Sequence, residues 1–192
     1  MKIISNKRKI TNLLRGEKDL GFIPTMGAIH KGHISLIRKS IKLSQKTIVS
    51  IFVNKHQFNQ KIDYQKYPRN IGRDILILRK YKVDYLYLPT SKQIYPKGPS
   101  KDLKISSLRK QLCGKYRPNH FESVVDVVDR FVKIIKPKKI YFGEKDMQQL
   151  KIIEDFFRKK KTKIKVIYCK TIREKNGVAY SSRNVLLLPK EK

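Results

Sequence analysis

Acidic residues are scarce in this chain: 15 Asp and Glu stand against 46 Lys and Arg, a formal net charge of +31. This imbalance excludes an acidic or neutral surface. Cysteine is scarce too, because Cys113 and Cys169 are too few for a disulfide-rich secreted domain and have no CxxC spacing. No run approaches the roughly 18 apolar residues of a membrane span, and no apolar signal segment follows the charged N-terminus. The sequence therefore predicts a soluble, cytoplasmic protein.

The sequence also lacks the compositional bias of a disordered chain. Hydrophobic residues make up 40% and aromatic residues 9% of the chain, and there are only 9 Gly and 8 Pro. No internal repeat or low-complexity linker divides the sequence. Since domains usually run to about 100–200 residues, 192 residues predict one domain with a substantial core.

The basic excess has two explanations. A charge of +31 can hold phosphate backbones, and strongly basic chains are common among nucleic-acid-binding proteins. However, 34 of the basic residues are Lys and only 12 are Arg, whereas specific phosphate and base contacts favour Arg. The lysines are also spread along the whole chain. A solvated lysine-rich surface is therefore the preferred interpretation, with a nucleic-acid-binding module as the alternative.

Short apolar runs alternate with segments of helical periodicity. The runs typical of buried strands are 20–24, 47–53, 84–88, 139–142 and 163–169. Apolar residues recur at helical spacing from Val124 to Ile135 and from Leu150 to Phe157, and another such segment begins at Ile34. This alternation predicts an α/β fold, a Rossmann-like parallel sheet with helices on both faces. Ligands then bind in the loops after the strands.

A glycine-containing segment, PTMGAIHKGH (24–33), follows the first of these runs. Its glycines allow the backbone to turn and to approach a ligand closely. We expect a helix starting near His33, with unpaired N–H groups pointing at an anion. His30 and His33 are three residues apart, so both imidazoles can reach one phosphate group and stabilise charge as pyrophosphate leaves. A histidine near a helix start can also be a simple cap, but the pair in this context favours function.

His30-Lys31-Gly32-His33 resembles the HxGH signature of the HUP-type nucleotidyltransferase superfamily, whose members release pyrophosphate. The longer PTMGAIHKGH run is more specific and resembles the pantothenate synthetase family. Further elements similar to that family follow in the same order and cover almost the whole chain. They are FVNKHQF (52–58), YPR (67–69), RPNHF (117–121), GEKDMQQL (143–150), TIRE (171–174) and SSRN (181–184).

The resemblance implies roles for particular residues. The catalytic group would be His33, His30, Lys145 and Arg183, with His33 as proton donor, although an imidazolium there could also act electrostatically. Gln57 and Gln149 would bind pantoate, and Gln57 would also contact β-alanine. The ATP-binding residues would be Met26, Gly27, Ala28, Ile29, His30, Lys31, Gly32, His33, Gly143, Glu144, Lys145, Asp146, Ile172, Tyr180, Ser181, Ser182 and Arg183.

Several of these residue types suit the chemistry without any resemblance. Lys145 lies in a loop after a predicted strand, where an ammonium can neutralise phosphate oxygens, although alone it would pass for a surface lysine. Two hydroxyls and a permanent cation at 181–183 suit triphosphate binding, but equally suit an ordinary turn. The amides of Gln57 and Gln149 can donate and accept, and so can orient a hydroxylated carboxylate. Cys113 and Cys169 are interpreted as structural or incidental.

The implied reaction is ATP-dependent ligation of pantoate and β-alanine to pantothenate through pantoyl adenylate, with release of pyrophosphate and AMP. Mg²⁺ would accompany ATP, its ligands are not identified by the sequence, and a homodimer is expected from the family alone. Two alternatives remain: another HxGH nucleotidyltransferase, which would ignore pantoate, and the nucleic-acid-binding module, whose binding would depend steeply on salt.

The sequence departs from the family pattern in places. Lys55 and His56 stand where Pro and an apolar residue are usual, and Asn119 replaces the Gly of RPGHF. The family usually continues past SSRN into a smaller domain that closes over the active site, whereas this sequence ends at Lys192. We therefore expect residues 1–192 to be a single nucleotide-binding catalytic domain without that lid, and ATP binding to survive better than turnover.

Overall fold

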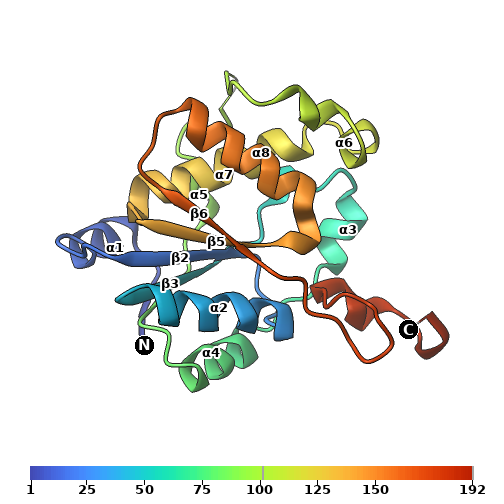
Figure 1. Cartoon of the computed structure of the whole chain (residues 1–192), viewed down its shortest axis with the longest axis horizontal. Helices are drawn as coiled ribbons and strands as arrows, with labels where there is room; N and C mark the ends of the chain where they lie inside the picture. Colours follow the sequence, from blue (N-terminus) through green and yellow to red (C-terminus); the bar gives the residue numbers. More distant parts are fainter. Residues whose placement is uncertain (101, 192) are drawn as a thin grey trace.

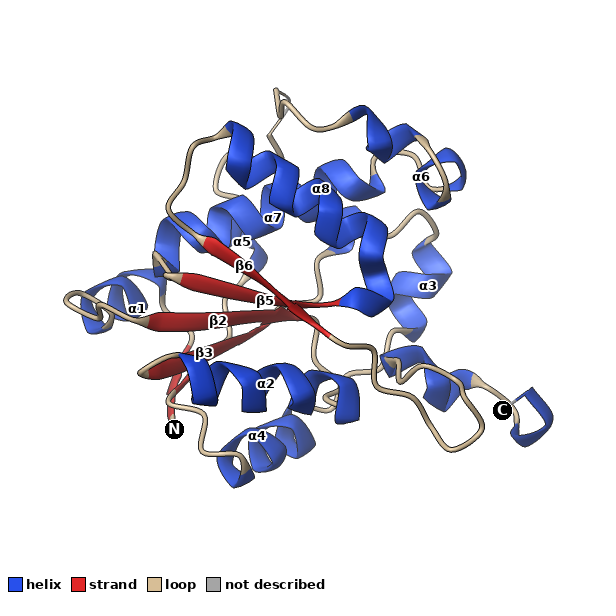
Figure 2. Ribbon diagram, viewed as in Figure 1, coloured by secondary structure: helices blue, strands red, loops and turns tan. Residues whose placement is uncertain are grey.

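Six parallel strands form one sheet at the centre of the computed structural model, which describes residues 1–100 and 102–191 (Figures 1 and 2). Their order across the sheet is β1-β4-β3-β2-β5-β6. The strands are β1 (Lys2–Ile4), β2 (Leu20–Thr25), β3 (Lys46–Ile51), β4 (Tyr85–Tyr87), β5 (Lys139–Gly143) and β6 (Lys165–Cys169). The predicted α/β fold with a parallel sheet is confirmed.

The central strands are buried on both faces, as their continuous apolar runs predict. Every residue of β2 is buried except Pro24, and every residue of β3 except its first, Lys46. The outer strands of the sheet differ from the expectation. Strand β4 is confined to Tyr85–Tyr87 and β6 begins only at Lys165. Strand β1 has just three, mostly exposed residues, a pattern too short to identify from sequence.

Helices cover both faces of the sheet (Figure 1). Their bounds are α1 (Lys7–Leu13), α2 (Lys31–Leu43), α3 (Lys61–Lys66), α4 (Ile71–Lys80), α5 (Ser91–Ile94), α6 (Cys113–Tyr116), α7 (His120–Ile135) and α8 (Met147–Lys159). Short 3₁₀ turns are Lys55–Gln57, Ser107–Lys110, Glu144–Asp146, Ser182–Leu186 and Pro189–Glu191. Helix α2 begins at Lys31 with His30 as its N-cap, earlier than the expected start near His33.

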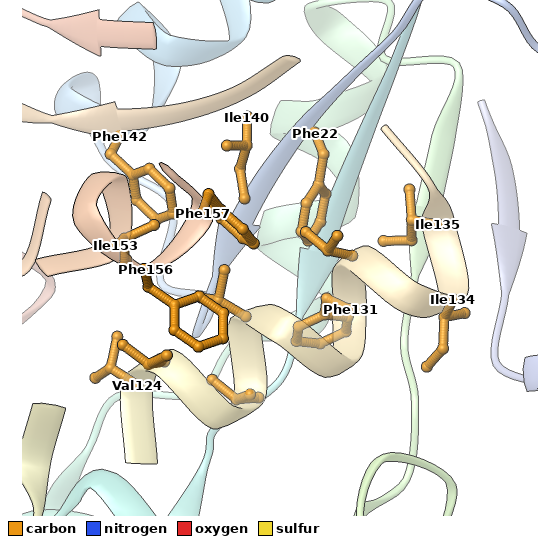
Figure 3. Packing of buried hydrophobic residues seen from close by; sticks show 14 of the residues in the cluster. Phe22, Val124, Phe131, Ile134, Ile135, Ile140, Phe142, Ile153, Phe156 and Phe157 are labelled. Carbon is orange, nitrogen blue, oxygen red and sulfur yellow. The ribbon is translucent and has the colours of Figure 1, made fainter. Parts of the chain in front are cut away.

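The two faces have separate cores. Helices α7 and α8 pack on one face around Phe131, whose ring centroid lies 5.6 Å from that of Phe22 in β2 (Figure 3). Helices α2 and α4 pack on the other face, where Ile37 and Leu78 are fully buried. The predicted stripe of α7 from Val124 to Ile135 is buried, which confirms that it faces the core. Removing a ring such as that of Phe131 costs about 3–5 kcal/mol in proteins generally.

The order of the strands determines where a ligand can bind. Strand β2 lies at the centre, with β3 on one side and β5 on the other. The chain runs from β2 outward through β3 and β4 to one edge, and later from β5 to β6 at the other. Such a reversal of direction opens a crevice at the carboxyl ends of the strands. The segment after β2 and the segment after β5 therefore meet at one site.

Candidate active site

A cavity of about 510 Å³ lies at the carboxyl ends of β2 and β5. Many predicted site residues line it together, although they come from distant parts of the sequence. They are Met26, His30, Gly32, His33, Gln57, Gly143, Lys145, Asp146, Gln149, Ile172, Tyr180, Ser181, Ser182 and Arg183. The other predicted ATP-binding residues, Gly27, Ala28, Ile29, Lys31 and Glu144, are not on its wall. They belong to the same loops and remain predictions.

The two histidines of the HxGH element form a reciprocal cap at the start of α2. His30 Nδ1 accepts a hydrogen bond from the Gly32 N–H at 3.1 Å, and His33 Nδ1 accepts one from the His30 N–H at 3.4 Å. Their ring centroids are 4.0 Å apart. Because each Nδ1 is an acceptor, the proton of each neutral ring is on Nε2. Both histidines therefore offer an Nε2–H donor at the cavity wall.

Burial keeps these rings neutral. It lowers the pKa of His30 to about 4, with a further contribution from the positive charge of Lys145. It lowers the pKa of His33 to about 3, to which the neighbouring His30 and Lys145 also contribute. At neutral pH the site therefore favours a neutral hydrogen-bond donor at His33 over the imidazolium considered from the sequence.

Asp74 of α4 holds the loop between β2 and α2. Its Oδ2 accepts from the Ala28 N–H at 2.9 Å and its Oδ1 from the Ile29 N–H at 2.7 Å. The carboxylate is buried, and desolvation raises its pKa even though these two hydrogen bonds oppose the shift. Ala28 has a positive φ of 50°, which a residue with a Cβ adopts at a cost. Asp74 thus stabilises a strained loop next to His30.

The two predicted cations already have partners. Lys145 Nζ lies 2.8 Å from Asp146 Oδ1 in the short 3₁₀ turn after β5. Arg183 makes two contacts with the carboxylate of Asp63 in α3, and its guanidinium carbon lies 5.3 Å from the centroid of the Tyr67 ring. A bound phosphate would therefore share these cations with carboxylates or displace the carboxylates.

The hydroxyl of Ser182 also has a hydrogen-bond partner within the protein. It donates to the Ala28 carbonyl at 3.2 Å, joining the segment after β6 to the loop after β2. Ser181 Oγ accepts from the Arg183 N–H at 3.3 Å and so shapes the turn. The sequence left a phosphate-binding role and simple turn chemistry open for these residues, and both serines have turn or tethering contacts while lining the cavity.

Gln57 is fixed on both its backbone and its side chain. Its carbonyl oxygen lies 2.7 Å from His120 Nδ1, and its side-chain Oε1 accepts from Asn54 Nδ2 at 3.3 Å. Since a carbonyl can only accept, His120 carries its proton on Nδ1 and has a free lone pair on Nε2. Burial lowers the pKa of His120, so this ring is neutral as well.

Sequence reasoning missed several residues of the cavity or its support. Arg117 and His120 line it, and both lie in the RPNHF element, so that element was the available signal. Asp74 is the single acid among the apolar and basic residues of helix α4, which is a weak signal. Asp63 gave no signal, because its partner Arg183 is 120 residues away.

The part of the chain that the structure describes contains no cluster of three His, Cys, Asp or Glu side chains able to hold a metal ion. Among the same residues, no helix is long and apolar enough to span a membrane.

The site combines the HxGH element at the start of α2 with Lys145 in the turn after β5, at the switch point of a parallel sheet. This combination is typical of nucleotide-binding enzymes of the nucleotidyltransferase type. Comparison with known families is more specific. The pantoate-β-alanine ligase family model matches residues 1–192, and the chain belongs to this family, whose known function is ATP-dependent synthesis of pantothenate.

Individual relatives agree with this assignment. Pantothenate synthetase of Pseudothermotoga lettingae is 45% identical over 192 residues, which are 100% of this chain and 68% of that protein. Pantothenate synthetase of Thermodesulfovibrio yellowstonii is 45% identical, over 96% of this chain and 66% of its own length. The chain thus spans about two thirds of the length of these relatives.

Solved structures give the same result. The pantoate-β-alanine ligase of Francisella tularensis, complexed with "beta-gamma ATP" and β-alanine, is 40% identical with a TM-score of 0.95, covering 98% of this chain and 74% of its own. Pantothenate synthetase of Thermus thermophilus is 36% identical with a TM-score of 0.94, covering 99% of this chain and 69% of its own.

Proposed function

We propose that this chain ligates pantoate and β-alanine to pantothenate through a pantoyl-adenylate intermediate formed in the cavity at the end of β2 and β5. The observation that carries the proposal is that one cavity is lined by both the HxGH histidines and the glutamine pair Gln57 and Gln149. A nucleotide site and an acid-binding site in one space allow two substrates to react without a covalent enzyme intermediate.

In the first step, a pantoate carboxylate oxygen attacks the α-phosphorus of ATP and the bond to the β-phosphate breaks, releasing pyrophosphate. The Nε2–H groups of His30 and His33 can donate to oxygens on which charge develops. Lys145, in the turn after β5, and Arg183, in the turn after β6, offset the negative charge of the phosphates. Position and electrostatics, rather than proton transfer, are the contribution of these residues.

In the second step, the amine of β-alanine attacks the acyl carbon, the bond to AMP breaks, and AMP leaves. Gln57 is available for this substrate as well as for pantoate. The Francisella relative, solved with β-alanine, supports a β-alanine site in this cavity. His120 has an Nε2 lone pair at the cavity wall and can accept a hydrogen bond from the incoming amine.

Three further expectations belong to the proposal. Mg²⁺ would be held mainly by phosphate oxygens, with the carboxylate of Asp146 available on the cavity wall, and would supply charge neutralisation. A homodimer is expected from the family. A cytoplasmic location is supported by the two cysteines, neither of which forms a disulfide.

Product analysis tests the proposed function. The chain is incubated with ATP, Mg²⁺, pantoate and β-alanine, and AMP and pantothenate are quantified by chromatography. We expect equal amounts of the two products, and none when any one substrate is left out. Adenylation of a different acid, with no response to pantoate, would instead identify another HxGH nucleotidyltransferase. Tight, salt-dependent polynucleotide binding that ATP and pantoate leave unchanged would identify the nucleic-acid-binding alternative.

A further inference from the structure

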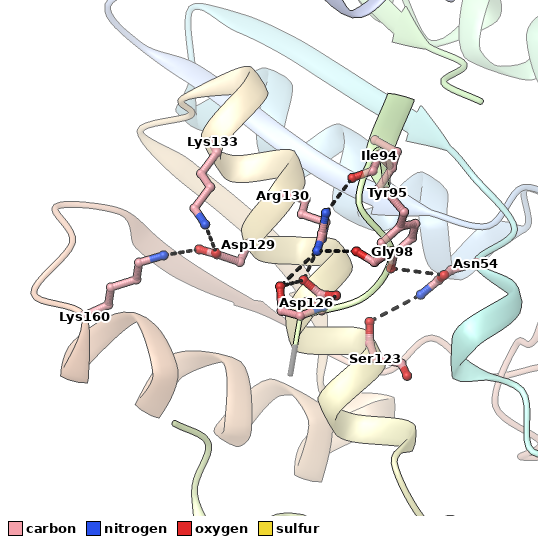
Figure 4. A network of polar contacts seen from close by, with 11 residues as sticks. Asn54, Ile94, Tyr95, Gly98, Ser123, Asp126, Asp129, Arg130, Lys133 and Lys160 are labelled. Atoms are coloured by element: carbon pink, nitrogen blue, oxygen red, sulfur yellow. Dashed lines mark hydrogen bonds and ion pairs between the residues drawn. The ribbon is translucent and has the colours of Figure 1, made fainter. Parts of the chain in front are cut away.

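Tyr95 begins a chain of hydrogen bonds that ends at Gln57. The Tyr95 hydroxyl donates to Asn54 Oδ1 at 3.2 Å (Figure 4). Asn54 Nδ2 has two acceptors, the Ser123 carbonyl at 3.3 Å and Gln57 Oε1 at 3.3 Å. Tyr95 itself is not part of the cavity wall, whereas Asn54 and Gln57 are.

The Ser123 carbonyl sets the direction of the bonds in this chain, and the Tyr95 hydroxyl stabilises the same orientation by donating to Asn54 Oδ1. The Ser123 carbonyl can only accept, so Asn54 must direct its NH₂ group toward Ser123. Asn54 Oδ1 is then the atom facing Tyr95, and the second N–H of the same amide faces Gln57. Gln57 therefore accepts through Oε1, and its own NH₂ group is its remaining polar group. Among the described residues, that NH₂ has only the sulfur of Met26, a weak acceptor, at 3.0 Å.

The tyrosine is held firmly in place. Its side chain is buried, and burial raises its pKa, so the hydroxyl keeps its proton. The guanidinium carbon of Arg130 lies 4.6 Å from the centre of the Tyr95 ring. Arg130 is in turn paired with the buried Asp126 at 2.7 Å and donates to the carbonyls of Ile94 and Gly98 (Figure 4). These contacts leave the hydroxyl little freedom to turn away from Asn54.

We propose that Tyr95 and Asn54 are positioning residues that hold the Gln57 amide with its NH₂ group available to substrate, so that Gln57 recognises a hydrogen-bond acceptor on pantoate. The acceptor is a carboxylate or hydroxyl oxygen. This inference rests on the proposed function, because it assumes that pantoate binds at Gln57, and it adds the polarity of the contact and the residues that set it.

Loss of the tyrosine hydroxyl has a defined consequence. Asn54 is only 1% exposed, so in Tyr95→Phe its Oδ1 becomes a buried acceptor without this partner. The Asn54 amide then loses one of the hydrogen bonds that hold its orientation. The Gln57 amide, which is held by Asn54, can rotate and present Oε1 to the substrate. Pantoate binding weakens, because Gln57 Oε1 would then face an acceptor oxygen of pantoate. Gln57 is not among the residues expected to bind ATP, so we expect the affinity for ATP to change little.

The chain offers a matched control. Tyr87 is fully buried and packs against the same Phe131 cluster, and its hydroxyl has no hydrogen-bond partner among the described residues. Tyr87→Phe therefore removes a buried hydroxyl without touching the chain from Tyr95 to Gln57. Thermal unfolding of both variants separates changes in folding from changes in the site.

Steady-state kinetics of wild type, Tyr95→Phe and Tyr87→Phe test the inference, with initial rates measured against pantoate and against ATP. We expect Tyr95→Phe to raise KM for pantoate about tenfold and to leave KM for ATP within about twofold, because one directed hydrogen bond is lost. Tyr87→Phe should match wild type. An unchanged KM for pantoate in Tyr95→Phe, or equal changes in both variants, would overturn the positioning role.

A double-mutant cycle measures the coupling between Tyr95 and Gln57 in KM for pantoate, which a purely structural role of Tyr95 would not produce. Gln57→Glu removes the donor, so Tyr95→Phe should have no further effect on KM for pantoate in that background. Multiplication of the two effects would overturn the inference. If wild type is active and Tyr95→Phe has the same KM for pantoate, the positioning role alone is overturned. If the rate of wild type does not depend on pantoate, the proposed function and this inference are overturned together.

Discussion

The guanidinium of Arg183 is clamped by the carboxylate of Asp63, with Nη2 2.9 Å from Oδ2 and Nε 3.1 Å from Oδ1. The pair links α3 to the turn after β6 at the edge of the cavity. The cation implied for phosphate binding is thus already compensated by a carboxylate. A phosphate arriving at this position competes with Asp63 for the same guanidinium.

Asp63→Asn should therefore bind ATP more tightly. The neutral amide leaves the charge of Arg183 uncompensated while keeping a similar shape. Both side chains of the pair are partly exposed, so screening limits the gain to about threefold to tenfold in Kd. Calorimetric titration of ATP into wild type and variant measures it, and the difference should shrink in high salt. Weaker binding by the variant would mean instead that Asp63 orients Arg183 for phosphate.

His33→Ala should lower kcat by about 10²–10³, as expected when one donor to a developing charge is lost. His33→Gln should keep more activity, because an amide N–H also donates a hydrogen bond without transferring a proton. Unfolding curves recorded alongside the rates verify that both variants fold. If His33→Gln were as inactive as His33→Ala, proton transfer from the imidazole would be the better account.

Stability should fall in mild acid because of the two capping histidines. Their folded pKa values, about 4 for His30 and about 3 for His33, lie below the unfolded value of 6.5. The unfolded chain therefore binds more protons below pH 6.5, and the stabilisation present above that pH is lost progressively as the pH falls toward 3–4. Denaturant unfolding at pH 7.5 and pH 5 should show a smaller loss for His30→Asn/His33→Gln than for wild type. Equal losses would contradict neutral capping.

Asp74→Asn should destabilise the fold by about 1–3 kcal/mol, because an amide can accept through only one oxygen and leaves one of two loop N–H groups without its partner. ATP binding should weaken as well, since the affected loop carries His30. Asp102→Asn is a suitable control, because Asp102 is an exposed acid. Denaturant unfolding and ATP titration together check the role. An Asp74→Asn variant as stable as the Asp102→Asn control would contradict it.

Local patterns predicted much of this structure. The apolar runs gave the central strands, and the stripe from Val124 to Ile135 gave the buried face of α7, because burial on a regular element repeats with its period. The loops after the parallel strands were expected to bind the ligand, but only the strand order shows that the segments after β2 and β5 meet at one site. Strand β1 escaped detection because three mostly exposed residues carry no periodicity.

Contacts between residues that are far apart along the chain could not be predicted from the sequence. Asp74 reaches Ala28 across 46 positions and Asp63 reaches Arg183 across 120, and no spacing rule connects such pairs. The protonation of the histidines was also hidden. It depends on the extended backbone of His30, which turns each Nδ1 toward an N–H group, and on burial that only the folded chain creates.

Exchange of labelled pyrophosphate into ATP tests the central claim most directly, because it reports reversible adenylation in this cavity before β-alanine enters. The account predicts exchange that requires pantoate, proceeds without β-alanine and is nearly abolished in His33→Ala. Exchange that is absent with pantoate, or that other carboxylic acids support equally well, would contradict the account.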